Sequence, residues 1–541
     1  MNIQEIQASL VDVELMTREG GPLKIEDSQR RQIAIFANRT ALVSAGFRYT
    51  PEFKVIERNA RQHKILIETV HEVEVPVLEA FYQGTGGAPE YTPSQLELER
   101  QVDLAELIRK AASERASDIH IRVVRGYTEI RTRVFGRVKD LESRKMDEGM
   151  AIIMAAFAVA SDLGSSSSTL SFMQGALTMK SGLLPPKVEM IRLQYSPTSD
   201  SRGALVMRLK YEAPANEIEI DHLGYNKGQI TDISTMRKRT NGMYVLAGKV
   251  SSGKSTTLQR VLNKMFVDKL REISMYTIEE PVELDLPGAI QVPAKKLPDG
   301  TDGFAGAMKA SLRSDPNIIV LGEIRSQELA YLAVQAVMTG HALWSTVHAG
   351  TALGILDRLT DLGVETWKLA DPTVIRGLVY QRLTGVLCPK CKVTFDEGVA
   401  NGSLEEELAD KISRLFDKSR SELYVRGPGC PSCKMGLGGR TVVAETVLTD
   451  PKLLEFYSKG ERIAMRDYWL LDRAEGGLGG VPVLHHALSK VGAGLCDINE
   501  VEEEVDLFEV YERDFMHLRP RLLADVAVLE EYEADKANNK K

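Results

Sequence analysis

The chain has 541 residues, 43% of them hydrophobic and 27% charged, with a formal net charge of −8 at pH 7. This length exceeds what one core can organise and predicts roughly three to four domains. The acidic net charge disfavours a non-specific nucleic-acid binder, which would carry a basic stripe. We also expect no specific nucleic-acid partner.

The first residues lack a basic segment followed by a long apolar run, so we expect no secretory signal. The longest apolar run, residues 151–160, is about half of the ~20 residues that a membrane-spanning helix needs. It predicts a buried helix instead. We therefore expect a cytoplasmic protein, in which the cysteines would not form a disulfide framework.

Residues 1–83 contain no chemical motif. Residues 84–95 are rich in glycine, proline and small polar residues and predict a linker. Residues 96–225 combine helical periodicity with alternating runs and predict a small α+β domain. Its expected strands are residues 119–124, 128–134, 188–194 and 204–210.

From about residue 230, short apolar strands alternate with helix-like segments, a pattern that predicts a parallel α/β sheet with crossover helices. The expected strands are residues 243–247, 273–278, 318–321 and 343–347. We place this domain at residues 230–505 and a cysteine-bearing insertion within it at 384–445. A charged helical tail is expected at 506–541.

Residues 248–255, Gly-Lys-Val-Ser-Ser-Gly-Lys-Ser, fit the phosphate-loop pattern G-x-x-x-x-G-K-[ST] between an expected strand and a helix. Glycines let such a loop aim successive N–H groups at phosphate oxygens, and the helix adds its positive end. A chance glycine-rich turn would not explain the flanking elements. The predicted nucleotide-binding residues here are Gly248, Ser251, Ser252, Gly253, Lys254, Ser255 and Thr256.

Three side chains of this loop have separate predicted roles. Lys254 supplies a positive charge to the β- and γ-phosphates and is a catalytic candidate. The Ser255 hydroxyl is a predicted Mg²⁺ ligand, and Thr256 helps to bind the α-phosphate. The loop therefore predicts a protein that binds ATP with Mg²⁺.

Two acidic segments follow expected strands. Glu323 ends the apolar run 318–323 and is expected to hold Mg²⁺, while Glu279, Glu280 and Glu283 cluster after another strand. Ligands of open α/β sheets lie at the carboxyl ends of the strands, so we expect both segments near the phosphate loop. A solvated acidic turn is the alternative for either segment alone.

His341 and His348 flank the expected strand 343–347. A lone histidine is usually structural. Two of them downstream of the acidic strand can instead sense the γ-phosphate or bond across a subunit boundary.

Cys388-Pro-Lys-Cys391 and Cys430-Pro-Ser-Cys433 are two C-x-x-C turns about forty residues apart. Two such turns can complete a closed, structural Zn²⁺ site. A redox motif is the alternative, but it would need only one pair. Cys496 stands apart and is expected to be a buried small side chain.

Together these motifs resemble the GspE/PilB-type ATPases of type II secretion and type IV pilus assembly, most of all the type IVb pilus ATPases. The likeness covers about residues 111–505. The motifs that match the family are residues 115–121 (Arg-Ala-Ser-Asp-Ile-His-Ile), the Walker A loop at 248–257, the Asp box at 277–283, the Walker B region at 312–325, the His box at 339–348 and the tetracysteine segment.

The resemblance implies a RecA-like P-loop NTPase domain, preceded by a PAS-like α+β domain and carrying a small zinc-binding insertion. It also implies a homohexamer with ATP between subunits, with ATP, Mg²⁺ and Zn²⁺ as cofactors. Residues 1–83 would dock a partner. The machine would act on an inner-membrane platform protein, at the cytoplasmic face of the bacterial inner membrane.

The resemblance also implies residue roles. Glu283, the last acid of the Asp box, corresponds to the base that activates water, Glu323 to the Walker B acid, and His348 to a contact of the γ-phosphate region. The preceding domain would supply arginines toward the nucleotide. Arg208 matches best and is a catalytic candidate, with Arg192 and Arg133 as the other candidates in that domain. Arg313 and Arg325, in the ATPase domain, also match family positions.

Several functions stay open at this point. An assembly motor is the first hypothesis, and a retraction ATPase or a type IV secretion or conjugation ATPase is the nearest alternative. Those alternatives usually lack a tetracysteine module, so the cysteines favour assembly. A non-catalytic nucleotide-dependent scaffold is disfavoured by Lys254, Glu283 and Glu323.

Overall fold

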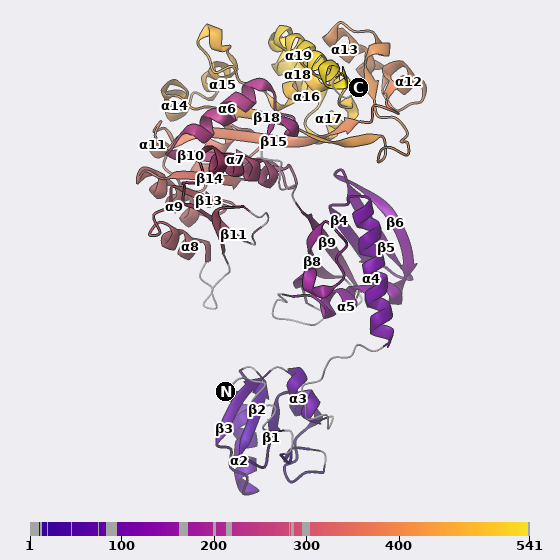
Figure 1. Ribbon diagram of the computed structural model, residues 1–541, viewed down its shortest axis with the longest axis vertical. Helices are drawn as coiled ribbons and strands as arrows, with labels where there is room; N and C mark the ends of the chain where they lie inside the picture. The colour runs from indigo at the N-terminus through magenta and orange to yellow at the C-terminus, as the bar shows by residue number, and fades with distance from the viewer. Residues whose placement is uncertain are drawn as a thin grey trace. The chain divides into compact units, whose positions relative to one another are not determined.

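The computed structural model describes residues 10, 13–18, 20–44, 46–73, 75–82, 95–161, 171–198, 202–212, 219–280, 282, 286–294 and 303–538. The chain divides into two compact units, Met1–Val102 and Asp103–Lys541 (Figure 1). The boundary lies inside the helix that follows the expected linker.

The first unit contains a three-stranded sheet with helices packed on it. Its elements are β1 (Ile33–Ile35), β2 (Thr40–Ser44), α2 (Pro51–Gln62), β3 (Thr69–Val73) and α3 (Val75–Tyr82). Strand β2 pairs antiparallel with β1 and parallel with β3, so α2 is a crossover helix. Phe53, Ile56 and Ala60 recur at helical spacing on α2 and are buried against the sheet.

The second unit begins with a six-stranded antiparallel sheet of order β6-β5-β4-β9-β8-β7. Its elements are α4 (Gln95–Ser113), β4 (Asp118–Val123), β5 (Tyr127–Val134), β6 (Arg137–Lys145), α5 (Met146–Ala158), β7 (Met173–Thr178), β8 (Val188–Thr198) and β9 (Arg202–Tyr211). The expected α+β arrangement and all four expected strands are confirmed. The PAS-like assignment stays a prediction.

Alternation along these strands separates a core face from a polar face. On β4, Ile119, Ile121 and Val123 are buried in one cluster with side chains of α4 and α5. Residues 118, 120 and 122 of the same strand project to the opposite face, because successive side chains of a strand alternate. That polar face carries Arg133, Arg192 and Arg208.

A seven-stranded sheet follows, in the order β12-β11-β13-β14-β10-β15-β18. Its strands are β10 (Gly242–Ala247), β11 (Met275–Glu279), β12 (Ala289–Pro293), β13 (Ile318–Leu321), β14 (Ala342–Val347), β15 (Ile375–Leu387) and β18 (Leu437–Val447). Every neighbouring pair is parallel except β15 with β18. The predicted parallel α/β sheet is therefore confirmed.

Helices cover both faces of this sheet. Met243, Val245 and Ala247 of β10 pack in one cluster with α8 (Gly303–Ser311), α9 (Gln327–Met338) and α10 (Gly354–Asp361). Tyr244 and Leu246 of the same strand pack in another with α6 (Lys227–Lys238) and α7 (Lys254–Asp268). A strand buried on both faces explains why β10 is apolar throughout.

The remaining elements of this unit pack in two places: residues 366–369 and 451–470 join the core cluster of β10, whereas residues 393–425 and 483–538 form a separate core against β18. These elements are α11 (Thr366–Leu369), β16 (Val393–Thr394), α12 (Phe395–Ala400), α13 (Glu406–Phe416), β17 (Tyr424–Val425), α14 (Pro451–Ser458), α15 (Arg462–Leu470), α16 (Val483–Gly492), α17 (Ile498–Glu504), α18 (Phe508–Asp514) and α19 (Arg519–Asn538). The expected tail is helical. Tyr511 and Leu522 are fully buried in one cluster with Phe416 and Leu484, so it packs on the cysteine-bearing segment.

Among the residues that the structure describes, no helix has the length and apolar character needed to cross a membrane.

Lys490 on α16 is 3% exposed and donates from Nζ to the carbonyl oxygens of Gly224 and Val442 and to the Thr441 hydroxyl, at 2.7, 2.6 and 2.7 Å. It ties α16 to β18 and to the segment before α6. Burial lowers the pKa of Lys490 from 10.5 to about 8.

This pKa predicts a pH-dependent stability. Between pH 8 and 10.5 the unfolded chain holds the Lys490 proton and the folded chain does not. Stability should therefore rise over that window by up to about 3 kcal/mol. Urea unfolding of wild type and of Lys490→Met, followed against pH, checks this, because only the wild type should show this contribution. Parallel pH profiles for the two proteins would contradict it.

Candidate active site

The phosphate loop leaves the carboxyl end of β10 and enters α7, as predicted. Gly253 has φ of 84° and forms the N-cap of α7. A Cβ on Gly248 would lie 2.3 Å from the Gln381 carbonyl oxygen and 2.5 Å from Ser252 Oγ. Local geometry therefore requires both glycines: Gly253 has a left-handed backbone, and Gly248 has no room for a Cβ.

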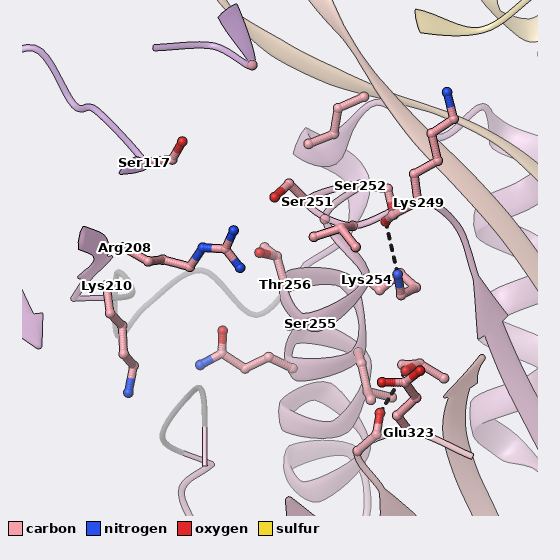
Figure 2. Close-up of a pocket in the computed structure, with 18 of the residues that line it drawn as sticks. Ser117, Arg208, Lys210, Lys249, Ser251, Ser252, Lys254, Ser255, Thr256 and Glu323 are labelled. Atoms are coloured by element: carbon pink, nitrogen blue, oxygen red, sulfur yellow. Dashed lines mark hydrogen bonds between the residues drawn. The ribbon is translucent and has the colours of Figure 1, made fainter. Parts of the chain in front are cut away.

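The Lys254 side chain folds back onto the phosphate loop and binds its backbone. Its Nζ donates to the carbonyl oxygens of Gly248 and Lys249, at 2.8 and 3.0 Å. Figure 2 shows Lys254 beneath Lys249 in the loop. The ammonium group therefore lies at the mouth of the loop. Phosphate oxygens are charged acceptors and make stronger bonds to it than neutral carbonyls.

The acidic segments converge on the same edge of the sheet. Parallel register aligns Ala247 with Val347 and Leu321 with Ser345, so the residues after these strands are neighbours. Glu323 and His348 meet there, with His348 Nε2 3.3 Å from Glu323 Oε1.

Glu279 and Glu280 lie at the end of β11 and line the same cavity. Glu279 accepts from the hydroxyl of Thr277 at 2.7 Å, and Glu280 pairs with Arg325 at 2.6 Å. Glu283 lies outside the described residues.

Two predicted nucleotide-binding residues are not brought to the cavity. His341 precedes β14 and therefore lies at the amino end of that strand, opposite to the phosphate loop. Its Nδ1 lies 3.0 Å from the Ala336 carbonyl oxygen and 3.1 Å from Thr339 Oγ1. Arg313 is exposed on the surface after α8.

The cavity has a volume of about 890 Å³ and is lined by the phosphate loop, the acids and the polar face of the six-stranded sheet. Arg133, Arg192 and Arg208 come from that sheet, and Figure 2 shows Arg208 directed toward Thr256. Its described lining holds nine lysines and arginines against six aspartates and glutamates. A positive cavity in a chain of net charge −8 suits a polyanion such as a nucleoside triphosphate.

Two buried residues that no sequence motif predicted support the phosphate loop from below. Gln381 on β15 is fully buried, donates from Nε2 to the Ser252 carbonyl oxygen at 2.8 Å, and accepts from the Tyr225 hydroxyl at 2.6 Å. Tyr225 also lies 3.1 Å from Thr257 Oγ1. No local motif marks Gln381 or Tyr225, because their contacts are far apart in sequence.

Replacing Gln381 with leucine should destabilise the loop. The change leaves the Ser252 carbonyl and the Tyr225 hydroxyl without their buried partner, which costs about 1–3 kcal/mol. Thermal denaturation with and without ATP should show a lower melting temperature and weaker stabilisation by ATP. Tyr225→Phe is the milder companion, since it leaves the Gln381–Ser252 bond in place. An unchanged melting temperature for Gln381→Leu would contradict this role.

The four predicted cysteine ligands lie together, with their sulfur atoms within 4.8 Å of one another. The distances are 3.8 Å for Cys388–Cys430, 3.6 Å for Cys391–Cys433 and 3.7 Å for Cys430–Cys433. Tetrahedral Zn–S bonds of ≈ 2.3 Å place the sulfurs about 3.8 Å apart. The cluster therefore has the size of a Cys₄ zinc site, and all four cysteines are free thiols.

Comparison with known proteins agrees with these features. Residues 95–501 match the family model described as type II/IV secretion system protein. The type II secretion system ATPase E of Vibrio cholerae is 32% identical over 417 residues, which cover 75% of this chain and 76% of the relative.

Two further relatives extend the comparison. The type II secretion system protein HxcR of Pseudomonas aeruginosa is 29% identical and covers 76% of this chain and 84% of its own length. The type IV pilus assembly ATPase PilB of Thermus thermophilus is 28% identical and covers 68% of this chain and 39% of its own length. The predicted resemblance to the GspE/PilB-type ATPases is confirmed, while the likeness to the type IVb pilus ATPases stays a prediction. The chain is an ATP hydrolase that belongs to the type II/IV secretion ATPase family.

Proposed function

We propose that this ATPase is the assembly motor of a type IV pilus or pseudopilus. It would work as a homohexamer at the cytoplasmic face of the inner membrane and act on a platform protein there. Two relatives support the proposal: one is named for type II secretion and another for type IV pilus assembly. The observation that carries it is the cavity itself, whose phosphate loop and arginines come from two different sheets.

In the proposed reaction, Glu283 activates the attacking water and Glu323 holds Mg²⁺ together with the Ser255 hydroxyl. Lys254 neutralises the β- and γ-phosphates. His348 contacts the γ-phosphate region, and its 3.3 Å contact with Glu323 supports that role.

The arginines would complete the site from the six-stranded sheet. Arg208, with Arg192 and Arg133 beside it, would stabilise the charge of the transferring phosphoryl group. Hydrolysis would then require the two sheets to approach, which couples chemistry to movement between domains. Arg325 lines the same cavity, whereas Arg313 and His341 would need a neighbouring subunit to reach a nucleotide.

The cysteine cluster favours assembly over the alternatives. We propose that it binds one structural Zn²⁺, which fixes residues 388–433 against the end of β15 and β18. The sulfur spacing of 3.6–3.8 Å supports zinc. Retraction and type IV secretion ATPases remain the second candidates, and they usually lack such a module.

The motor hypothesis is tested by ATP turnover of the purified protein with its platform partner, for wild type and Glu283→Gln. Loss of the base should lower kcat about 10²-fold or more while ATP still binds. Glu272→Gln, an exposed acid just before β11, is the control. Absence of wild-type turnover, together with no effect of Glu283→Gln, would refute the motor. In cells, the same variant should lack pili, whereas a defective retraction motor would leave them.

A further inference from the structure

Four charged residues stand at one register across the six-stranded sheet. Asp118 on β4 is the cross-strand partner of Arg133 on β5 and of Arg208 on β9. Arg208 is in turn the partner of Arg192 on β8. The resulting row is arginine, aspartate, arginine, arginine, and all four residues line the nucleotide cavity.

Asp118 is the buried member of this row. Its side chain is 3% exposed, while those of Arg133 and Arg208 are 37% and 53% exposed. Asp118 Oδ1 accepts from Arg208 Nε at 2.9 Å, and Oδ2 lies 3.6 Å from Arg133 Nε. The Ser117 hydroxyl donates to Oδ2 at 2.8 Å.

This geometry leaves the terminal nitrogens of Arg208 directed toward the phosphate loop. A guanidinium group is planar, with its Nε–H near the stem and its two terminal nitrogens at the far end. Asp118 binds the Nε–H, so it fixes the side chain by its stem. Figure 2 shows the Arg208 side chain directed from β9 toward Thr256 of the phosphate loop.

The order of charges in this row also has an electrostatic explanation. Cross-strand neighbours have Cβ atoms about 4.5–5.5 Å apart, and like charges at that distance repel. Arg208 and Arg192 are such neighbours, and Asp118, on the opposite side of Arg208, offsets part of their repulsion. Asp118 also lies between Arg208 and Arg133, which are two strands apart, and its negative charge attracts both.

We propose that Asp118 is a positioning residue for hydrolysis, which holds Arg208, and secondarily Arg133, in the orientation that meets the ATP phosphates. It does not itself contact the nucleotide. The inference rests on the proposed role of Arg208. A purely structural ion pair is the competing explanation, and it would change the melting temperature without changing kcat selectively.

The test compares steady-state ATP hydrolysis by the full-length protein as wild type, Asp118→Asn, Arg208→Ala and the double variant. Asp118→Asn keeps the size of the side chain but removes its negative charge and so weakens its hydrogen bond to the Arg208 guanidinium group. We therefore expect kcat to fall about 10-fold. KM for Mg-ATP should change by less than about 3-fold, since ground-state binding rests on the phosphate loop. The double variant should be no slower than Arg208→Ala, because both changes remove one interaction.

Asp140→Asn is the matched control. Asp140 on β6 accepts a hydrogen bond from Arg131 Nε on β5 at 2.8 Å. The pair lies in the same sheet and has the same kind of donor, an arginine Nε, but it is outside the cavity. The kcat of Asp140→Asn should stay within about twofold of wild type. Asp118→Glu is a control for misfolding, because it keeps the negative charge and the ion pair with Arg208. Its extra methylene group displaces Arg208, so kcat should again fall.

The outcomes separate the two hypotheses. Near wild-type kcat for both Asp118 variants, with a slow Arg208→Ala, would overturn the positioning role alone. A wild-type rate for Arg208→Ala would refute the proposed role of Arg208 and the inference with it. Multiplied losses in the double variant would also overturn the inference.

Discussion

Lys254→Ala is expected to lower ATP hydrolysis by about 10²–10³-fold or more, the loss typical of removing one preorganised charge from a transition state. The structure places Nζ at the mouth of the phosphate loop, 2.8 Å from the Gly248 carbonyl oxygen. The remaining loop N–H groups can still orient a nucleotide, and the other loop lysine, Lys249, is directed away from Lys254 in Figure 2, so it does not replace this charge at the proposed phosphate site. Phosphate release from Mg-ATP measures the effect.

Lys264→Ala is the matched control on the same helix. Lys264 pairs with Glu219 and Asp268 and does not line the cavity, so its loss should leave kcat near wild type. A Lys254→Ala protein that keeps more than about a tenth of the wild-type rate would place the chemistry elsewhere.

The double substitution Cys430→Ser with Cys433→Ser is expected to abolish metal binding and unfold the surrounding segment. Structural zinc binds zinc-finger peptides with a free energy of about 10–16 kcal/mol at pH 7, and that binding free energy is also folding free energy. The cluster joins the end of β15 to the start of β18, and α12 and α13 lie between its two halves. Metal analysis should fall from about one zinc per chain to near zero, with faster proteolysis of residues 388–433.

Cys496→Ala is the control for this change. Cys496 is buried in the same part of the chain but lies outside the four-cysteine cluster. Its loss should leave zinc content unchanged and cost no more than a small cavity. Less than about half an equivalent of zinc in the wild-type protein would refute the metal assignment.

Features whose chemistry is local could be predicted from the amino-acid sequence alone. The phosphate loop needs its glycines, lysine and serine within eight consecutive residues, so residues 248–255 were recognisable without a fold. Strands such as β10 and β13 are buried on both faces and are therefore apolar throughout, which made them easy to predict. The paired C-x-x-C turns predicted four thiols, which the structure brings within 4.8 Å.

Other strands escaped prediction for a physical reason. Strand β6 is an edge strand whose residues are all half-buried or exposed, so it lacks a strict alternation of apolar and polar side chains. Strands β15 and β18 extend into the predicted insertion, and their pairing joins residues about sixty positions apart. Periodicity describes one segment at a time and carries no information about its partner.

The contacts that support the active site depend on long-range pairing and could not be predicted from local sequence. Gln381 reaches Ser252 across 129 positions, and Arg208 reaches Asp118 across 90. Each of these residues is ordinary in its own segment, and its role comes from the strand that lies beside it. Sheet register, which is set by burial of one face and by distant pairing, therefore determined which arginines share a carboxylate and face the phosphate loop.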